Sequence, residues 1–191
     1  MKIAQRMIIE FNRWRYQTSP ISFYDVLQQP RRILVILPAN LRYAQFYGDI
    51  VELLKHISTR TTLKFVASRF PTGLVADLTN GYEVYYPGIS HQTKFDLPHR
   101  DFIQRVSHFI PKIAIDLEPS QTPYNAIIAL KSGASARIGM ENGLGVPFYN
   151  LQVRSDLTAS IEKKYDDMFE FVYNFFNWDK SLEKLEFDVE E

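Results

Sequence analysis

Polar side chains occur where the predicted strands of this sequence end, and they are the first candidates for chemistry. In an open parallel sheet, ligands bind beyond the carboxyl ends of the strands. We predict these ends at residues 38–42, 68–70, 118–122 and 141–145. Carboxylate, amide, hydroxyl and guanidinium groups at such positions can hydrogen-bond a polar ligand. The predicted ligand-binding residues are Asn40, Arg42, Glu118, Ser120, Asn125, Arg137, Glu141 and Asn142.

Two interpretations apply to the residues around position 118. In the first, Glu118, Ser120, Asn125 and Arg137 form one polar cluster in a cleft. In the second, Glu118 and Ser120 help to cap a helix that begins near Thr122, and Arg137 pairs with a carboxylate. The second interpretation needs no ligand and is the simpler one.

The glycine-rich segment Gly139–Gly145 also has two interpretations. Its backbone N–H groups could approach a bound anion. A plain turn that needs glycine for positive φ explains the same composition without a ligand.

Familiar catalytic and cofactor signatures are absent from the sequence. The predicted strand at 33–37 is followed by no glycine for ten residues, which excludes a dinucleotide-binding fingerprint. Neither a P-loop nor a nucleophile elbow occurs. There is no cysteine, and the four histidines lack the close spacing of metal-binding pairs. We therefore expect no cofactor and no metal site, and we assign no catalytic residue. The histidines are expected to be surface or edge residues: His56, His91, His99 and His108.

Residues 112–140 determine the predicted fold class. Ile113–Leu117 is a short strand-like run that ends in polar residues. Thr122 and Pro123 are typical of a helix start, with a capping hydroxyl and then a proline at the first helical position. Gly133 is expected to end that helix in a left-handed conformation, and Arg137 begins the next extended segment. A strand, a crossover helix and a strand within about thirty residues form a parallel βαβ unit.

The rest of the chain repeats this alternation of strands and helices. Five apolar residues at 33–37 predict a central strand buried on both faces. Further strands are expected at 63–67, 82–86 and 146–153, and a helix at 46–57. Two more helices are expected, one with Phe102, Val106 and Phe109 inward and a last one that starts at Asp156 or Thr158.

This alternation predicts an α/β protein with a single Rossmann-like domain over residues 1–191. Its sheet is expected to be doubly wound and mainly parallel, with helices on both faces. The charged segment 179–191 is expected to be a frayed tail.

An amphipathic helix is predicted at the N-terminus, within residues 1–17. Ile3, Met7, Phe11 and Trp14 fall on one face of a helix over residues 2–16, with basic residues elsewhere. We expect the apolar face to pack on the domain's own sheet. The alternative is peripheral contact with an anionic membrane surface, which suits a basic amphipathic helix.

Composition excludes several classes of protein. Lys and Arg together number 22, as do Asp and Glu, so no global field attracts nucleic acid. No segment reaches the roughly 18–20 apolar residues that cross a bilayer, and the N-terminus lacks a signal-peptide block. We therefore expect a cytoplasmic protein, with the N-terminal helix as the one candidate contact with the inner face of the membrane.

A family resemblance appears over residues 112–153. The Ile-Asp-Leu strand end, the small-residue helix, Ser132-Gly133-Ala134 and Ala136-Arg137-Ile138-Gly139 resemble the N-terminal half of the heptosyltransferases. The segment Pro147–Val153 is also similar to that family. The heptosyltransferases are glycosyltransferases of family 9, of the two-domain GT-B type. The resemblance implies a Rossmann-like acceptor-binding domain and a sugar or nucleotide-sugar ligand.

The sequence departs from the family in two places. The resemblance implies a Gly-Asp pair after the first strand, whose aspartate would be the base, but Asn40 and Arg42 occupy this turn. The nearest such pair, Gly48-Asp49, falls inside the next predicted helix and is expected on its surface. The residues after Val153 suffice for one helix and a tail, and not for a second Rossmann-like domain that would hold a nucleotide sugar.

These departures predict a stand-alone, catalytically degenerate relative of the heptosyltransferase acceptor domain. Its expected role is binding or assembly, as a homodimer or with a partner protein. One alternative is a half-transferase that obtains its nucleotide-sugar domain from another chain, with Glu118 or Glu141 in place of the missing aspartate. The other alternative is a peripheral membrane adaptor.

Overall fold

The structure is a computed structural model of the whole chain. It describes residues 3–16, 22, 26, 31–57, 61–68, 70–88, 93, 96–120, 122–141, 143–156 and 158–177.

A six-stranded sheet with the order β3-β2-β1-β4-β5-β6 forms the centre of the molecule. All five strand pairings are parallel, and Ile33 of β1 lies opposite Ile113 of β4. The predicted doubly wound α/β fold is therefore confirmed. The strands are β1 (Arg31–Ile36), β2 (Thr61–Val66), β3 (Glu83–Tyr85), β4 (Ile113–Asp116), β5 (Ala136–Met140) and β6 (Leu151–Val153).

The central strands are buried on both faces, as their unbroken apolar runs predict. Ile33 and Val35 of β1 point into one core cluster, while Leu34 and Ile36 point into the other. Side chains alternate between the two faces because a strand has a period of two residues. Each face of β1 and β4 therefore needs its own layer of helices.

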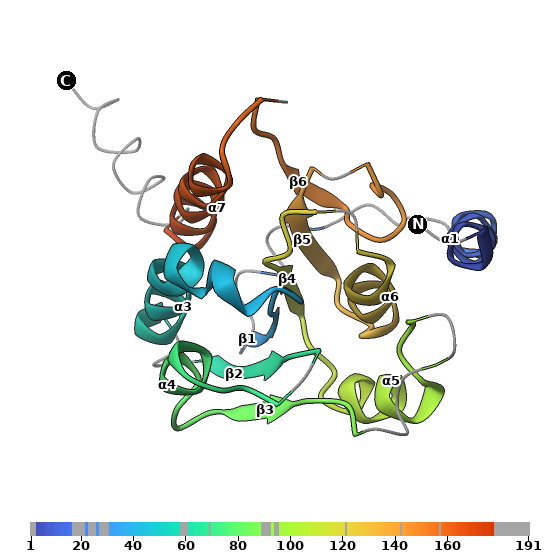
Figure 1. Cartoon of the computed structure of the whole chain (residues 1–191), viewed down its shortest axis with the longest axis horizontal. Coiled ribbons are helices and arrows are strands. Elements are labelled where there is room, and N and C mark those ends of the chain that lie inside the picture. Colours follow the sequence, from blue (N-terminus) through green and yellow to red (C-terminus); the bar gives the residue numbers. More distant parts are fainter. Residues whose placement is uncertain are drawn as a thin grey trace.

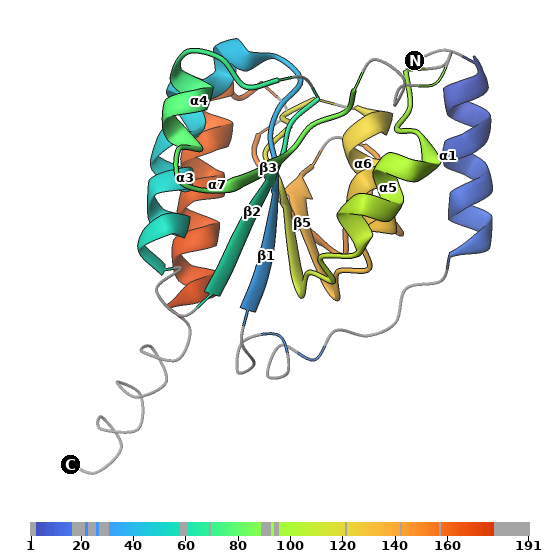
Figure 2. The ribbon, with the colours of Figure 1, turned by 90° about the horizontal axis from the view of Figure 1, so that it is seen from below.

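Two helical layers cover the sheet (Figures 1 and 2). One face carries a 3-10 turn at Leu41–Tyr43 followed by α3 (Ala44–Ile57), then α4 (Leu74–Leu78) and α7 (Ile161–Phe176). The other face carries α5 (Arg100–Ser107) and α6 (Pro123–Lys131). The N-terminal helix α1 (Ile3–Arg15) lies outside α6, in a third layer.

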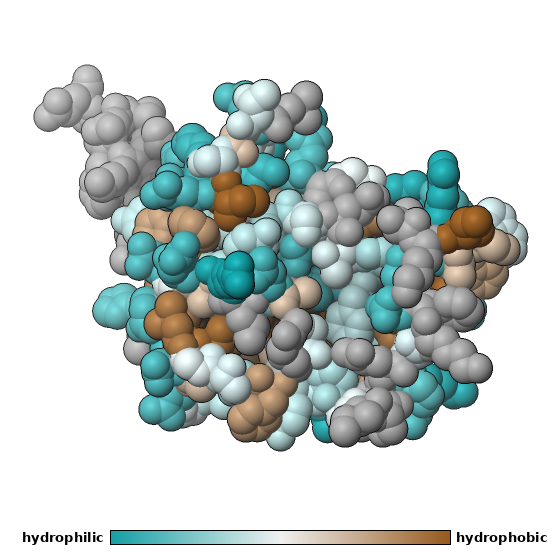
Figure 3. All heavy atoms as spheres, in the orientation of Figure 1, coloured by the Kyte–Doolittle hydropathy of each residue, from teal (hydrophilic) through white to brown (hydrophobic). Residues whose placement is uncertain are grey.

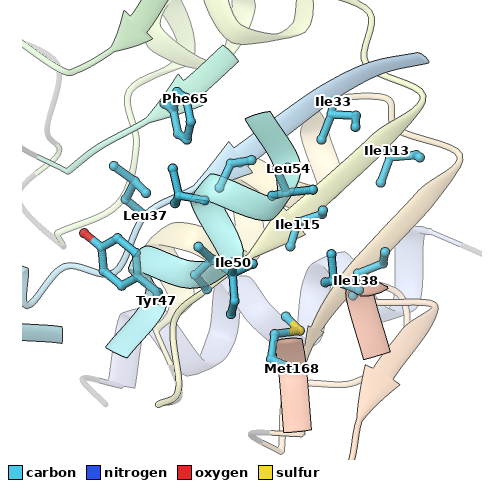
Figure 4. Packing of buried hydrophobic residues seen from close by; sticks show 14 of the residues in the cluster. Ile33, Leu37, Tyr47, Ile50, Leu54, Phe65, Ile113, Ile115, Ile138 and Met168 are labelled. Carbon is cyan, nitrogen blue, oxygen red and sulfur yellow. The ribbon is translucent and has the colours of Figure 1, made fainter. Parts of the chain in front are cut away.

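The core on the α3 side is apolar and closely packed (Figure 4). Tyr47, Ile50 and Leu54 of α3 face the sheet, and Met168 of α7 packs beside them. The predicted inward positions of α5 and its C-terminal neighbour, Phe102, Val106 and Phe109, are also buried.

The prediction for the packing of α1 is wrong. Ile3, Met7 and Trp14 are 82%, 67% and 80% exposed, and Phe11 is half-exposed. The helix is instead held by its opposite face, where Gln5, Ile9 and Asn12 are buried, and it rests on α6 and not on the sheet. The amphipathic pattern was correctly located, but it does not say which face turns inward.

Smaller predictions also differ from the structure. Thr122 precedes α6 but makes no side-chain capping bond, although Pro123 and the positive φ of Gly133 are as expected. Only Leu151–Val153 of the predicted strand 146–153 is a strand, because a turn with a cis Val146–Pro147 peptide occupies its first half. The proposed tail 179–191 lies outside the described residues. Among the described helices, none is long and apolar enough to cross a membrane.

We predict that the core under α3 contributes strongly to the stability of the fold. Replacing the fully buried Leu54 by alanine removes methyl groups from a closely packed site and should lower the free energy of unfolding by about 2–5 kcal/mol. The matched substitution Leu74→Ala, at a helix position that is 50% exposed, should change it by less than about 1 kcal/mol. Urea unfolding followed by circular dichroism measures both. Equal losses for the two variants would contradict the packing described here.

Candidate functional site

The candidate site lies between β1 and β4, where the order of the sheet changes direction. From β1 the chain proceeds through α3 to β2, and from β4 it proceeds through α6 to β5 on the other side. The two helices lie on opposite faces of the sheet (Figure 2). Such a switch point separates the loops that follow two adjacent parallel strands, and ligands of open α/β sheets bind there.

Glu118 connects the ends of the two strands. Its side chain is 3% exposed, and its Oε2 accepts a hydrogen bond of 3.0 Å from the backbone N–H of Ala39, just beyond β1. Its Oε1 accepts bonds from the backbone N–H of Ser120, at 3.2 Å, and from the Ser120 hydroxyl. Glu118 therefore holds the loops after β1 and β4 together, and it does not cap α6.

Asp116, the last residue of β4, is the centre of the same network. It is 1% exposed. Its Oδ1 accepts from the Asn125 amide and from the backbone N–H of Glu118, each at 3.0 Å. Its Oδ2 accepts from the Tyr149 hydroxyl at 2.5 Å. The Asn125 amide also donates to the carbonyl oxygen of Leu37, at 3.2 Å, so α6 is bound to the ends of both strands.

Burial raises the pKa of Asp116 to about 7. The hydrogen bonds from Tyr149, Asn125 and the backbone of Glu118 act in the opposite direction, and the charge of Glu118 adds to the increase. Desolvation is the larger effect, because removing the carboxylate from water destabilises its charged form by more than the hydrogen bonds from these donors stabilise it. The Asp116 carboxyl group thus holds a proton more readily than an exposed aspartate does.

Gly139 makes room for the tyrosine that reaches Asp116. Gly139 lies opposite Asp116 in the sheet, and a Cβ at this position would meet the Tyr149 ring at 2.7 Å. The ring can therefore lie against β5 only because this position has no side chain. On the other face of the sheet, the buried Tyr165 of α7 donates to the carbonyl oxygen of Leu117 at 2.8 Å.

Asn40 and Arg42 lie in the loop after β1, beside this network. Both side chains are exposed, and Asn40 accepts a bond from the backbone N–H of Arg42 at 3.1 Å. Ser120, in the loop after β4, is exposed as well. The structure thus brings Asn40, Arg42, Glu118, Ser120 and Asn125 together at the switch point.

Arg137 does not belong to this group, and both interpretations of it are wrong. It lies near the amino end of β5, where its guanidinium donates to the carbonyl oxygens of Ala134, Pro147 and Phe148 at 2.7, 3.1 and 3.0 Å. Burial lowers its pKa. Arg137 therefore fixes the turn before β6 through backbone carbonyls and pairs with no carboxylate among the described residues.

Glu141 is separate from the switch point too. It follows β5 and pairs with Arg154 at 3.1 Å, close to a groove of about 440 Å³ at the glycine-rich turn. Gly143 and Gly145 have positive φ, and the carbonyl oxygens of residues 143 and 144 accept bonds from Arg13. This favours a plain turn over an anion site, since the turn presents acceptors to a cation. Asn142 lies outside the described residues.

The described residues contain no group of three or more His, Cys, Asp or Glu side chains arranged to hold a metal ion. His56 and His108 are exposed, and His99 caps α5 by accepting from the backbone N–H of Asp101. His91 lies outside the described residues.

A scan against protein-family models and a search of curated proteins gave no match. A search of solved structures found similarity to the crystal structure of a glycosyl transferase family 9 protein from Veillonella parvula. The TM-score is 0.51 at 16% identity, and the similarity covers 78% of this chain and 42% of that one. This chain has a glycosyltransferase-like fold. At this identity the likeness shows the fold of the glycosyltransferase-like domain and nothing about its activity.

Asp116, Tyr149 and Gly139 were not predicted to be parts of the site. Asp116 is a lone acid in an otherwise apolar strand, which is a signal that could have been used, because a buried carboxylate needs partners. Tyr149 had no local signal, since it lies 33 residues from Asp116 and reaches it only through the fold.

We predict that glycine to alanine substitutions at positions 139 and 48 have opposite effects. At Gly139 the added Cβ overlaps the Tyr149 ring, so the free energy of unfolding should fall by about 1–3 kcal/mol. At Gly48, inside α3, the nearest atom to a new Cβ is a Leu78 methyl carbon at 3.7 Å, and the helix should gain about 0.5–1 kcal/mol. Chemical denaturation tests the contrast, and a neutral Gly139→Ala variant would exclude the tight ring packing.

We also predict that the titration of Asp116 makes the free energy of unfolding depend on pH. Because the pKa of Asp116 is about 7 in the folded state and near 3.8 when the side chain is exposed in the unfolded state, only the folded state retains this proton between these two pH values. Its contribution to stability is therefore fully present below about pH 4 and is lost as the pH rises to about 7. Asp116→Asn should remove this slope, which is at most about 1.4 kcal/mol per pH unit.

Urea denaturation at pH values across that window measures the effect. The exposed Asp49, a surface residue of α3 as predicted, provides the control, because Asp49→Asn should keep the wild-type slope. Parallel curves for the wild type and Asp116→Asn would show that Asp116 is ionised throughout.

Proposed function

We propose that this protein is a glycosyltransferase-like domain, similar to the acceptor-binding domain of the heptosyltransferases, with a binding or assembly role in place of sugar transfer. One observation carries the proposal. The two carboxyl groups at the switch point, Asp116 and Glu118, are buried and bound by the protein's own donors. The exposed side chains beside them belong to Asn40, Arg42 and Ser120.

A sugar-transferring site needs a base that removes a proton from the acceptor hydroxyl, and this base must come within hydrogen-bond reach of that proton. Asp116 accepts three hydrogen bonds and is 1% exposed, so an acceptor hydroxyl cannot reach it in this conformation. The amide of Asn40 cannot take up a proton as a carboxylate does. Among the described residues, the exposed side chains beside the network therefore supply no carboxylate base for transfer.

The same exposed groups suit recognition of a polar ligand. Asn40 and Ser120 offer both donors and acceptors, and Arg42 adds a cation. A sugar presents hydroxyl groups that use both kinds of partner, and a nucleotide sugar adds phosphates that arginine binds well. We therefore take a sugar or a nucleotide sugar as the ligand class.

One observation favours a second candidate function, a half-transferase completed by a donor domain from another chain. The Glu118 carboxylate reaches Ala39, next to the turn where the heptosyltransferase resemblance implies an aspartate. If the loop after β1 moved, Glu118 could serve as the base. Glu141 is a poorer replacement because it lies beyond β5 and pairs with Arg154.

A binding and transfer assay on the purified protein tests the proposal. In titrations with a panel of sugars and nucleotide sugars, we expect at least one ligand to bind without transfer. Arg42→Ala should weaken that ligand about tenfold, as expected for the loss of a charged hydrogen bond of roughly 1.5 kcal/mol. Arg154→Ala is the control, because it removes another exposed arginine side chain, one that pairs with Glu141 away from the switch point; it should leave binding unchanged.

Sugar transfer by the purified chain would overturn the proposal. Transfer that requires a partner protein and is abolished by Glu118→Gln would establish the second candidate. If no ligand of the panel binds, the ligand class is wrong.

A further inference from the structure

The N-terminal helix α1 presents an apolar surface to the outside of the molecule. We define the α1 stripe as Ile3, Met7, Phe11 and Trp14, which are 82%, 67%, 52% and 80% exposed. The spacing of these residues aligns them along one face of the helix over roughly 16 Å. The helix lies at the edge of the molecule, outside α6 in both ribbon views, and brown atoms mark its place at the right of Figure 3. Exposed apolar patches of this kind mark interaction sites.

The orientation of α1 is fixed by contacts on its other face. Ile9 is buried in the core cluster that includes α6, and Tyr16 contacts the Lys131 side chain at the end of α6. Arg13 donates to the carbonyl oxygens of Gly143 and Leu144, at 3.2 and 2.9 Å. These contacts come from the middle of the helix to its C-terminal end, and the α1 stripe cannot turn inward without breaking them.

Positive charge flanks the α1 stripe on both sides. Helical geometry puts Arg6 and Arg13 along one side and Arg15 along the other. The one acid of the helix, Glu10, forms an ion pair with Arg13 at 2.8 Å. With three arginines and one glutamate, the helix carries a formal charge of +2. An apolar stripe with Trp and Phe and with arginines beside it is the pattern of helices that lie in a membrane interface.

The apolar surface continues from the stripe into a groove beside α6. Phe11 also lines this groove, which has a volume of about 530 Å³ and includes Ile8, Leu97 and Ile127. Acyl chains tolerate such an irregular surface, because they adapt their shape to it. A second copy of the protein is a poorer fit, since the four stripe residues expose on the order of 500 Å², below the about 800 Å² per partner of a stable dimer.

We propose that α1 docks this protein on an anionic lipid surface, with the α1 stripe in the interface and Arg6 and Arg15 at the level of the head groups. The proposal is independent of the sugar ligand and of any transferase activity. In this proposal the buried face of α1 attaches the helix to α6, and the exposed face attaches the protein to lipid.

Flotation of the full chain with vesicles tests the proposal. The protein should float with vesicles of phosphatidylcholine and phosphatidylglycerol, less at high salt, and much less with phosphatidylcholine alone. The double substitution Met7→Ser and Trp14→Ser should lower the partition coefficient roughly tenfold or more. Phe169→Ser with Tyr173→Ser, which removes a pair of partly exposed aromatic residues on α7, is the matched control and should float like the wild type.

A fluorescence measurement tests the same proposal without the Met7→Ser/Trp14→Ser variant, so the result does not depend on whether that variant folds. The protein has two tryptophans, so in a Trp178→Phe variant the emission comes from Trp14 alone. That emission should shift to shorter wavelength when anionic vesicles are added. The proposal would be overturned if the wild type did not bind the vesicles or if the Trp14 emission did not shift. It would also be overturned if light scattering showed a dimer that the Met7→Ser/Trp14→Ser variant no longer formed. That last result would assign the α1 stripe to contact with a second copy of the chain.

Discussion

The structure depends on the burial of two neighbouring carboxyl groups, at the end of β4 and just beyond it, that face the end of β1. A buried carboxylate is strongly unfavourable unless its oxygens are hydrogen-bonded. Asp116 and Glu118 meet this condition with donors from separate segments: Ala39 after β1, Ser120 after β4, Asn125 in α6 and Tyr149 before β6. Each segment must be in place for the network to be complete. The network thus specifies how the two halves of the sheet, α6 and the last turn fit together.

This constraint also bears on chemistry. Oxygens that hold the fold together are not available to a substrate unless the loops move, and such a move would leave buried donors without partners. In the described part of the switch point, Asp116 and Glu118 accept hydrogen bonds from the protein itself, and the exposed side chains of Asn40, Ser120 and Arg42 supply an amide, a hydroxyl and a guanidinium. Such groups are sufficient to recognise a ligand by hydrogen bonds, whereas removal of a proton from an acceptor hydroxyl requires a base.

The sequence was sufficient for the fold because its signals there are local. The apolar run at 33–37, Pro123 at a helix start and Gly133 at a helix end each report the conformation of their own segment. The location of Glu118, Ser120 and Asn125 beyond the end of a strand was predicted for the same reason, because they are polar residues that follow an apolar run. The partners of Arg137 and the contact of Tyr149 with Asp116 could not be found this way, because they depend on how distant segments meet.

The packing of α1 follows from the composition of α6. Every residue of α6 from Pro123 to Leu130 is buried, and most of them are apolar, so this helix needs cover on the side away from the sheet as well. Helix α1 supplies part of that cover through Ile8, Ile9 and Tyr16. The opposite face of α1 carries the exposed α1 stripe, which α6 does not cover. The sequence of α1 thus reflects its packing on α6 through one face, and its other face is the one that we propose to contact lipid.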